Sequence, residues 1–102
     1  MERRKEPRRA FAELYCNRFI DGFPHMAKVL DLSPSGMRVR CIAEPAHASK
    51  RIPVELLVPG RHATSWLWTK PVRRVGETDV LSFVGLDPIE RARLAKLCRS
   101  AP

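Results

Sequence analysis

The chain has 102 residues, 44% of them hydrophobic, and its 19 Lys and Arg against 11 Asp and Glu give a formal net charge of +8. This length accommodates one small domain with a modest core and leaves no room for a catalytic domain beside a regulatory one. The positive charge favours anionic partners, although a basic surface can also serve solubility alone.

Residues 1–9 form a segment that is rich in charge, with five basic and two acidic side chains. Such a segment cannot bury enough apolar surface to offset the entropy lost on ordering, so we predict an arm that is mobile when nothing is bound. No apolar stretch typical of a signal peptide follows, and no run approaches the ~18 apolar residues of a membrane span. Three cysteines without C-x-x-C spacing are typical of reduced thiols. We therefore expect a cytoplasmic protein that does not insert into a membrane.

Residues 10–102 are predicted to form a single domain. Alternation of apolar and polar residues predicts a first strand with Ala12, Leu14 and Cys16 on one face. The remaining strands are predicted at residues 26–32, 36–41, 52–58, 65–75 and 78–86. In the third strand the residues that face inward are Met37, Val39 and Cys41, while Arg38 and Arg40 face outward. Six short strands with tight connections favour a closed antiparallel barrel, because closure removes exposed strand edges.

The sequence predicts one helix, over residues 88–99. Asp87 is suited to be its N-cap, and Pro88 to its first position. The apolar stripe of this helix consists of Leu94, Leu97, Cys98 and Ala101. We expect the stripe to pack on the barrel; docking of a partner is the alternative.

The residues that usually indicate catalysis or metal binding are missing from the sequence. His25, His47 and His62 are isolated, with no second ligand at metal-binding spacing. There is no Gly-rich phosphate loop, nucleophile elbow or close carboxylate pair. We therefore expect no enzymatic activity, no metal and no cofactor.

A first candidate site is Arg4-x-x-x-Arg8, flanked by Arg3 and Arg9. A guanidinium group can grip a phosphate through two N–H bonds and can also stack on a purine or donate to its O6 and N7 edge. The arginines therefore suit a compact anion that carries phosphates and guanines. For this spacing alone, a solvated tail is the simpler interpretation.

A second candidate site is Asp31-x-Ser33-x-x-Gly36, between the second and third predicted strands. These residue types build a tight β-turn in which glycine accepts a positive φ. The same turn is also suited to a ligand: Asp31 can accept from the N1 and N2 donors of guanine, and Ser33 can bind a phosphate or fix the turn. Gly36 would let the ligand approach the backbone. The two interpretations are compatible.

The order and spacing of the two sites resemble the PilZ family. The family pattern R-x-x-x-R followed by [D/N]-x-S-x-x-G is matched by Arg4, Arg8, Asp31, Ser33 and Gly36. The resemblance covers nearly the whole chain, since residues 72–74 and 82–86 are similar to the end of a long barrel strand and to the last strand of the family.

The resemblance implies an all-β fold: a six-stranded antiparallel PilZ-type β-barrel, with a C-terminal α-helix packed on it and a flexible basic N-terminal arm. It also implies that cyclic di-GMP binds on the outer surface of the barrel, with the arm wrapped over the ligand. The ligand-binding residues would be Arg3, Arg4, Arg8, Arg9, Asp31, Ser33 and Gly36. An arginine at the position of Arg3 implies two stacked ligand molecules, and Arg9, where relatives have an apolar residue, would add a phosphate contact.

Trp66 and Trp68 share one face of the predicted strand 65–75. Packing in the core or at the barrel rim is the simpler role. Stacking of one of them on a bound base is the alternative, as on nucleic-acid-binding barrels.

We therefore predict a receptor or adaptor that binds cyclic di-GMP, orders its arm on binding and signals through a protein partner that the sequence does not identify. One alternative is a PilZ-like interaction module that binds no nucleotide. The other is a small basic barrel that binds RNA or single-stranded DNA, which the charge and the tryptophans favour. Nucleic acid is the less expected partner, because it leaves both motifs unexplained.

Overall fold

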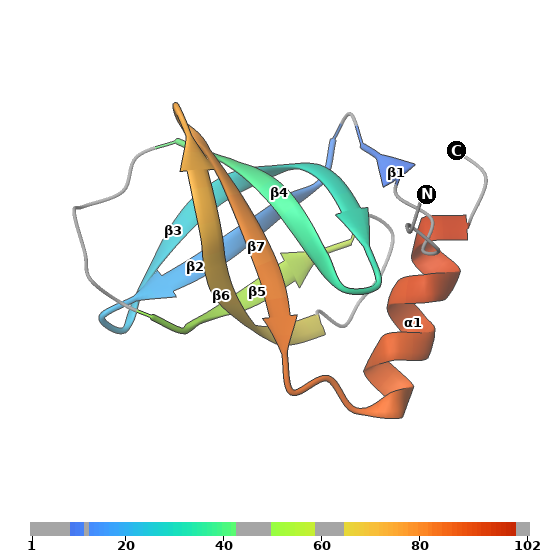
Figure 1. Cartoon of the computed structure of the whole chain (residues 1–102). Coiled ribbons are helices and arrows are strands. Elements are labelled where there is room, and N and C mark those ends of the chain that lie inside the picture. The colour runs from blue at the N-terminus through green and yellow to red at the C-terminus, as the bar shows by residue number, and fades with distance from the viewer. Residues whose placement is uncertain (1–8, 12, 43–49, 59–64, 100–102) are drawn as a thin grey trace.

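The computed structural model describes residues 9–11, 13–42, 50–58 and 65–99. In this part of the chain an antiparallel sheet closes into a barrel, with one helix beside it (Figure 1). The elements are β1 (Arg9–Ala10), β2 (Tyr15–Ile20), β3 (Phe23–Ser33), β4 (Gly36–Cys41), β5 (Ile52–Leu57), β6 (Ser65–Val75), β7 (Thr78–Val84) and α1 (Pro88–Arg99). The prediction of a six-stranded antiparallel barrel followed by a helix is confirmed. In the ranges that the structure describes, no helix is long and apolar enough to cross a membrane.

The strands follow the order β1-β3-β2-β5-β6-β7-β4, and an additional pairing of β3 with β4 closes the ring. All pairings are antiparallel. The short strand β1 lies outside this ring and extends the pairing of β3, with Arg9 opposite Leu32 and Ala10 opposite Asp31. The end of the N-terminal segment is therefore held against the strand that carries Asp31.

The core fills the inside of the barrel with aliphatic side chains and is closed at one end by α1. Its buried members are Leu14, Cys16, Ile20, Ala27, Val29, Leu32, Met37, Val39, Ile52, Val54, Leu56, Leu67, Leu81, Leu94 and Cys98. Each strand from β2 to β7 contributes residues from its inner face, because successive side chains of a strand point to opposite faces. The helix is docked by Leu94 and Cys98, and the Cys98 thiol donates to the carbonyl of Leu32 at 3.3 Å.

The boundaries of β6 and α1 coincide with the predicted ranges, and Asp87 caps α1 by accepting from the amide of Glu90 at 2.8 Å. β3 begins three residues before the predicted start at residue 26. Leu14 is buried as predicted, but it precedes the strand rather than belonging to it. Ala12 and Ala101, predicted to face the core, lie outside the described residues.

A register shift in β3 decides which face Asp31 occupies. Val29 lies opposite Val39, yet Asp31 lies opposite Arg38, so that Leu30 is an extra residue in the pairing. Regular alternation after Val29 would turn Asp31 into the barrel. The shift instead places Leu32 in the core and turns Asp31 to the outer face of the sheet, where it pairs with Arg38.

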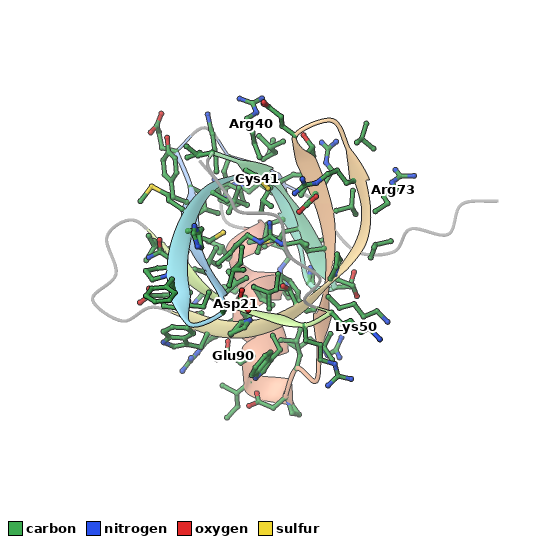
Figure 2. All side chains as sticks on the ribbon, turned by 90° about the vertical axis from the view of Figure 1, so that its left-hand side faces the viewer. Asp21, Arg40, Cys41, Lys50, Arg73 and Glu90 are labelled. Atoms are coloured by element: carbon green, nitrogen blue, oxygen red, sulfur yellow. The ribbon has the colours of Figure 1, made fainter. Side chains whose placement is uncertain are left out.

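A second register shift, in β6, turns Arg74 toward the inner face of the barrel. Pro71 lies opposite Leu81 and Arg73 opposite Val80, so that Val72 is the extra residue. Beyond the shift, Arg74 shares the inner face with Asp79, while Arg73 projects outward. In Figure 2, Arg73 and Arg40 both project outward from the barrel.

A charged cluster fills the end of the barrel away from the β3–β4 turn. The fully buried Arg18 donates to the Asp79 carboxylate at 3.0 Å, and Arg74 donates to the same carboxylate at 2.9 Å. Both guanidinium groups also approach the Cys41 sulfur, at 3.3 and 3.4 Å. Burial alone would raise the pKa of Asp79, but the hydrogen bonds and charges of Arg74 and Arg18 outweigh it and lower the pKa below 3.8. The cluster was not predicted from the sequence.

Candidate functional site

The turn between β3 and β4 is built by Ser33, whose side chain is fully buried. Its hydroxyl donates to the carbonyl of Gly36 at 3.3 Å and accepts from the amide of Ser35 at 3.4 Å. The carbonyl of Ser35 in turn accepts from the amide of Phe83 at 2.9 Å, which ties the turn to β7. Of the two roles considered for Ser33, the structure shows that of fixing the turn.

Gly36 is required by close packing rather than by its backbone conformation. The glycines with positive φ among the described residues are Gly22, Gly76 and Gly85, so the expected positive φ at Gly36 is wrong. A Cβ atom at Gly36 would instead collide with the backbone carbonyl oxygen of Leu81 on β7. The absence of a side chain lets β4 and β7 approach each other beneath the turn.

Asp31 lies next to this turn and is held by a cross-strand partner. Its side chain is 6% exposed, and its Oδ2 atom accepts from the Nε atom of Arg38 at 2.6 Å. The guanidinium of Arg38 remains half exposed. The carboxylate is therefore fixed in position beside a cation that still faces solvent.

Arg38 was predicted only to face outward, and its contact with Asp31 was missed. The signal was present in the sequence: a hairpin with the two-residue loop Pro34-Ser35 places Ser33 opposite Gly36, and hence Asp31 opposite Arg38. Opposite charges at directly opposed positions attract each other. The hairpin register would thus have identified this pair.

β1 brings the end of the N-terminal segment to the same place. Ala10 lies opposite Asp31, and the Arg9 guanidinium donates to the carbonyl of Leu97 at 3.1 Å, near the C-terminal end of α1. The same guanidinium lies 4.8 Å from the ring centroid of Phe11. Arg9 thus connects β1 to the helix, where a cation is favoured by the helix dipole. Figure 1 shows β1 beside this end of α1.

The predicted ligand-binding residues Arg3, Arg4 and Arg8 lie outside the described residues. In the sequence they precede Arg9, which lies opposite Leu32 in the pairing of β1 with β3. The structure therefore places Arg9, the last residue of the arginine-rich segment, beside the strand that carries Asp31.

The outer surface of β4, β7 and β6 next to the turn carries exposed cations, and we call it the basic face. One row across these strands is formed by Arg38, Val80 and Arg73, and the next by Gly36, Ser82 and Lys70. Arg38, Lys70 and Arg73 are all exposed. This arrangement offers several positive charges to an anion that touches the turn.

The two tryptophans lie on the outer surface and not in the core, with 52% of Trp66 and 54% of Trp68 exposed. The Trp66 ring contacts that of Phe19, with centroids 5.0 Å apart. Trp68 instead lines a pocket with Arg51, Val84 and Gly85. Stacking of a base on either ring remains a prediction.

Among the residues described, no group of three or more His, Cys, Asp and Glu is placed to hold a metal ion. His25 lies on β3, whereas His47 and His62 lie outside the described ranges. The arrangement around the turn combines a fixed carboxylate with several exposed cations.

Comparison with known proteins places this geometry in context. The sequence profile of the PilZ domain matches residues 2–100. No curated protein matches the chain significantly. Among solved structures, the PilZ domain of Escherichia coli YcgR, described with cyclic di-GMP, has a TM-score of 0.75 at 18% identity and aligns with 95% of this chain and 89% of its own.

Two further structures share the fold. The Bacillus subtilis inhibitor of motility MotI/DgrA has a TM-score of 0.66 at 17% identity, over 96% of this chain and 50% of its own. The PilZ domain of CeSA from a cellulose-synthesising bacterium has a TM-score of 0.59 at 15% identity, over 91% of this chain and 89% of its own. At these identities the likeness concerns the fold.

Proposed function

Because the chain belongs to the PilZ domain family, we propose that it is a receptor for cyclic di-GMP that catalyses no reaction and acts through a protein partner. The observation that supports the proposal is the pairing of β1 with β3, which places Arg9 and Ala10 beside the strand that carries Asp31. Arg9 follows directly on the first half of the family pattern in the sequence, and the strand it pairs with carries the start of the second half. The similar YcgR domain, described with cyclic di-GMP, supports the choice of ligand.

The roles of the residues follow from their chemistry. The guanidinium groups of Arg4 and Arg8 would bind phosphates and guanine edges, because each can form two parallel hydrogen bonds. Asp31, fixed by Arg38, would accept from a guanine. Ser33 and Gly36 would shape the turn against which the ligand lies. Arg9, which donates to Leu97, would anchor the arm and could add a phosphate contact.

The signal would be a change of the surface. Ligand capture would order the arm against the barrel and neutralise much of its positive charge. Ordering the arm costs several kcal/mol, which charge-assisted hydrogen bonds from two or more guanidinium groups can offset. A partner that distinguishes the two surfaces would read the state of the receptor, and we place this event in the cytoplasm.

Calorimetric titration with cyclic di-GMP at physiological salt tests the proposal. We expect saturable binding that is lost in Arg8→Ala and Asp31→Ala, with the circular dichroism spectrum unchanged. Arg91→Ala, on the exposed face of α1, removes the same charge and should bind like the parent protein. Arg3 predicts two ligand molecules per chain; a ratio of one would keep the receptor and remove the stacked pair.

Three results would replace the proposal. The absence of heat with cyclic di-GMP would leave an interaction module that binds no nucleotide. Binding of single-stranded RNA alone, with steep salt dependence, would indicate a nucleic-acid-binding barrel instead. Equal losses in Arg91→Ala and Arg8→Ala would mean that net charge, and not the motif, drives association.

A further inference from the structure

A pocket of about 220 Å³ opens on the outer surface of the barrel and is lined by Arg51, Trp68, Val84 and Gly85. Trp68 is half exposed and provides a flat aromatic wall, and Arg51 provides a cation. Gly85 has no side chain to fill the space. Pockets that hold drug-sized molecules have volumes of about 300–1,000 Å³, so this one suits a single ring system.

The pocket lies on the outer surface of β6 and β7, near the basic face and the turn. Trp68 lies opposite Val84 on β7, and two residues further Lys70 lies opposite Ser82, which in turn lies opposite Gly36 of the turn. Two strand spacings and two residues separate Gly36 from Trp68, which amounts to roughly 12 Å across the sheet. Lys70 is exposed and neighbours both, since it lies in the row of Gly36 and on the strand of Trp68.

The turn, the Lys70 ammonium and the pocket at Trp68 are arranged like the parts of a dinucleotide, in which phosphates join two bases. An indole ring stacks on any nucleobase, and a guanidinium beside it can donate to the O6 and N7 edge of a purine or to a phosphate. The ammonium of Lys70 suits a phosphate placed between the turn and the pocket. We infer that Trp68 and Arg51 form a second purine subsite, reached from the turn across Lys70.

The inference rests on the proposed function, because it extends the same site. It assigns roles to three residues outside the family pattern, namely Arg51, Trp68 and Lys70. The purine could belong to the dinucleotide already bound at the turn or to a second molecule stacked on it. Both sources have the same chemistry, and the stoichiometry of binding separates them.

Trp66 provides a matched control on the same strand and face, since it is exposed to nearly the same extent as Trp68. Its ring is engaged by Phe19, and the residue opposite it is Glu55, which accepts from Asn17. A carboxylate at that position disfavours an approaching phosphate. Of the described residues, Trp66 thus has Phe19 and Glu55 as neighbours, whereas the pocket at Trp68 is lined by the cation Arg51.

The chain contains two tryptophans, so each single substitution leaves one fluorescent reporter. We would titrate Trp66→Phe and Trp68→Phe with cyclic di-GMP, and follow tryptophan emission and calorimetric heat in parallel. The emission of Trp68, observed in Trp66→Phe, should be quenched; that of Trp66, observed in Trp68→Phe, should not change. Trp68→Ala should weaken binding by about 5- to 100-fold, and Arg51→Ala should weaken it as well.

The outcomes separate the two proposals. Quenching that is complete at one ligand per chain assigns the purine to the first molecule, and quenching that requires a second equivalent assigns it to a stacked one. Heat without quenching of Trp68, or equal quenching of both tryptophans, overturns the subsite and keeps the receptor. The absence of heat in the parent protein overturns both.

Discussion

Removing the carboxylate of Asp79 should destabilise the barrel strongly, since it would leave Arg18 charged inside the protein. The Arg18 side chain is fully buried and lies 3.0 Å from Asp79, whereas the Arg74 side chain is 53% exposed. In Asp79→Asn, Arg74 can turn to solvent, but Arg18 cannot. The loss should therefore come mainly from Arg18.

The magnitude follows from the burial of the pair. Removing one partner of a buried ion pair costs about 3–5 kcal/mol, because the remaining charge stays desolvated. A domain of this size is stabilised by about 5–15 kcal/mol in total. With a urea dependence of about 1–3 kcal/mol per molar, the midpoint of unfolding should fall by roughly 2 M.

Urea unfolding followed by circular dichroism measures this change. Arg74→Gln removes the exposed arginine as a control and should cost no more than about 1 kcal/mol. The double variant Arg18→Met, Asp79→Asn also removes the buried charge of Arg18 and should therefore be more stable than the single variant Asp79→Asn. A loss below about 1 kcal/mol in Asp79→Asn, or no recovery in the double variant, would refute the argument that the buried charge of Arg18 depends on Asp79.

Three further predictions follow from single contacts. Because folding lowers the pKa of Asp79, the contribution of its carboxylate to the free energy of unfolding is complete above the pKa of the unfolded state, at about pH 4. This contribution is lost as the pH falls through the lower pKa of the folded state. The free energy of unfolding, measured between neutral and acid pH, should therefore change less in Asp79→Asn than in the parent protein. Gly36→Ala should cost about 1–3 kcal/mol in urea unfolding, because its Cβ meets the carbonyl of Leu81, and an unchanged midpoint would contradict this packing. Arg38→Gln should weaken cyclic di-GMP binding in calorimetry by at least about tenfold, since Asp31 loses its charged hydrogen bond; unchanged affinity would show that Arg38 does not position Asp31 for the ligand.

Much of the site could be read from the sequence because its parts are local. The turn residues Ser33 and Gly36 lie within one hairpin, and the pair of Asp31 and Arg38 follows from the register of that hairpin. The pocket at Trp68 could not be read in this way. Arg51 directly precedes β5 and Val84 lies on β7, and both meet Trp68 through the pairing of β5 and β7 with β6. The register between β6 and β7 shifts at Val72, so the position opposite Trp68 does not follow from the turn that joins the two strands.

The sequence by itself determined the strand periods, the capped helix from Pro88 to Arg99 and the two motifs, because alternation, capping and turn chemistry depend on residues a few positions apart. The tertiary structure alone decided that Arg74 joins Asp79. The extra residue Val72 interrupts the alternation of β6 and turns Arg74 toward Asp79, at an end of the barrel where its side chain stays half exposed. The position of such an extra residue depends on how two strands fit their partners around the closed ring, and these contacts join distant segments of the chain.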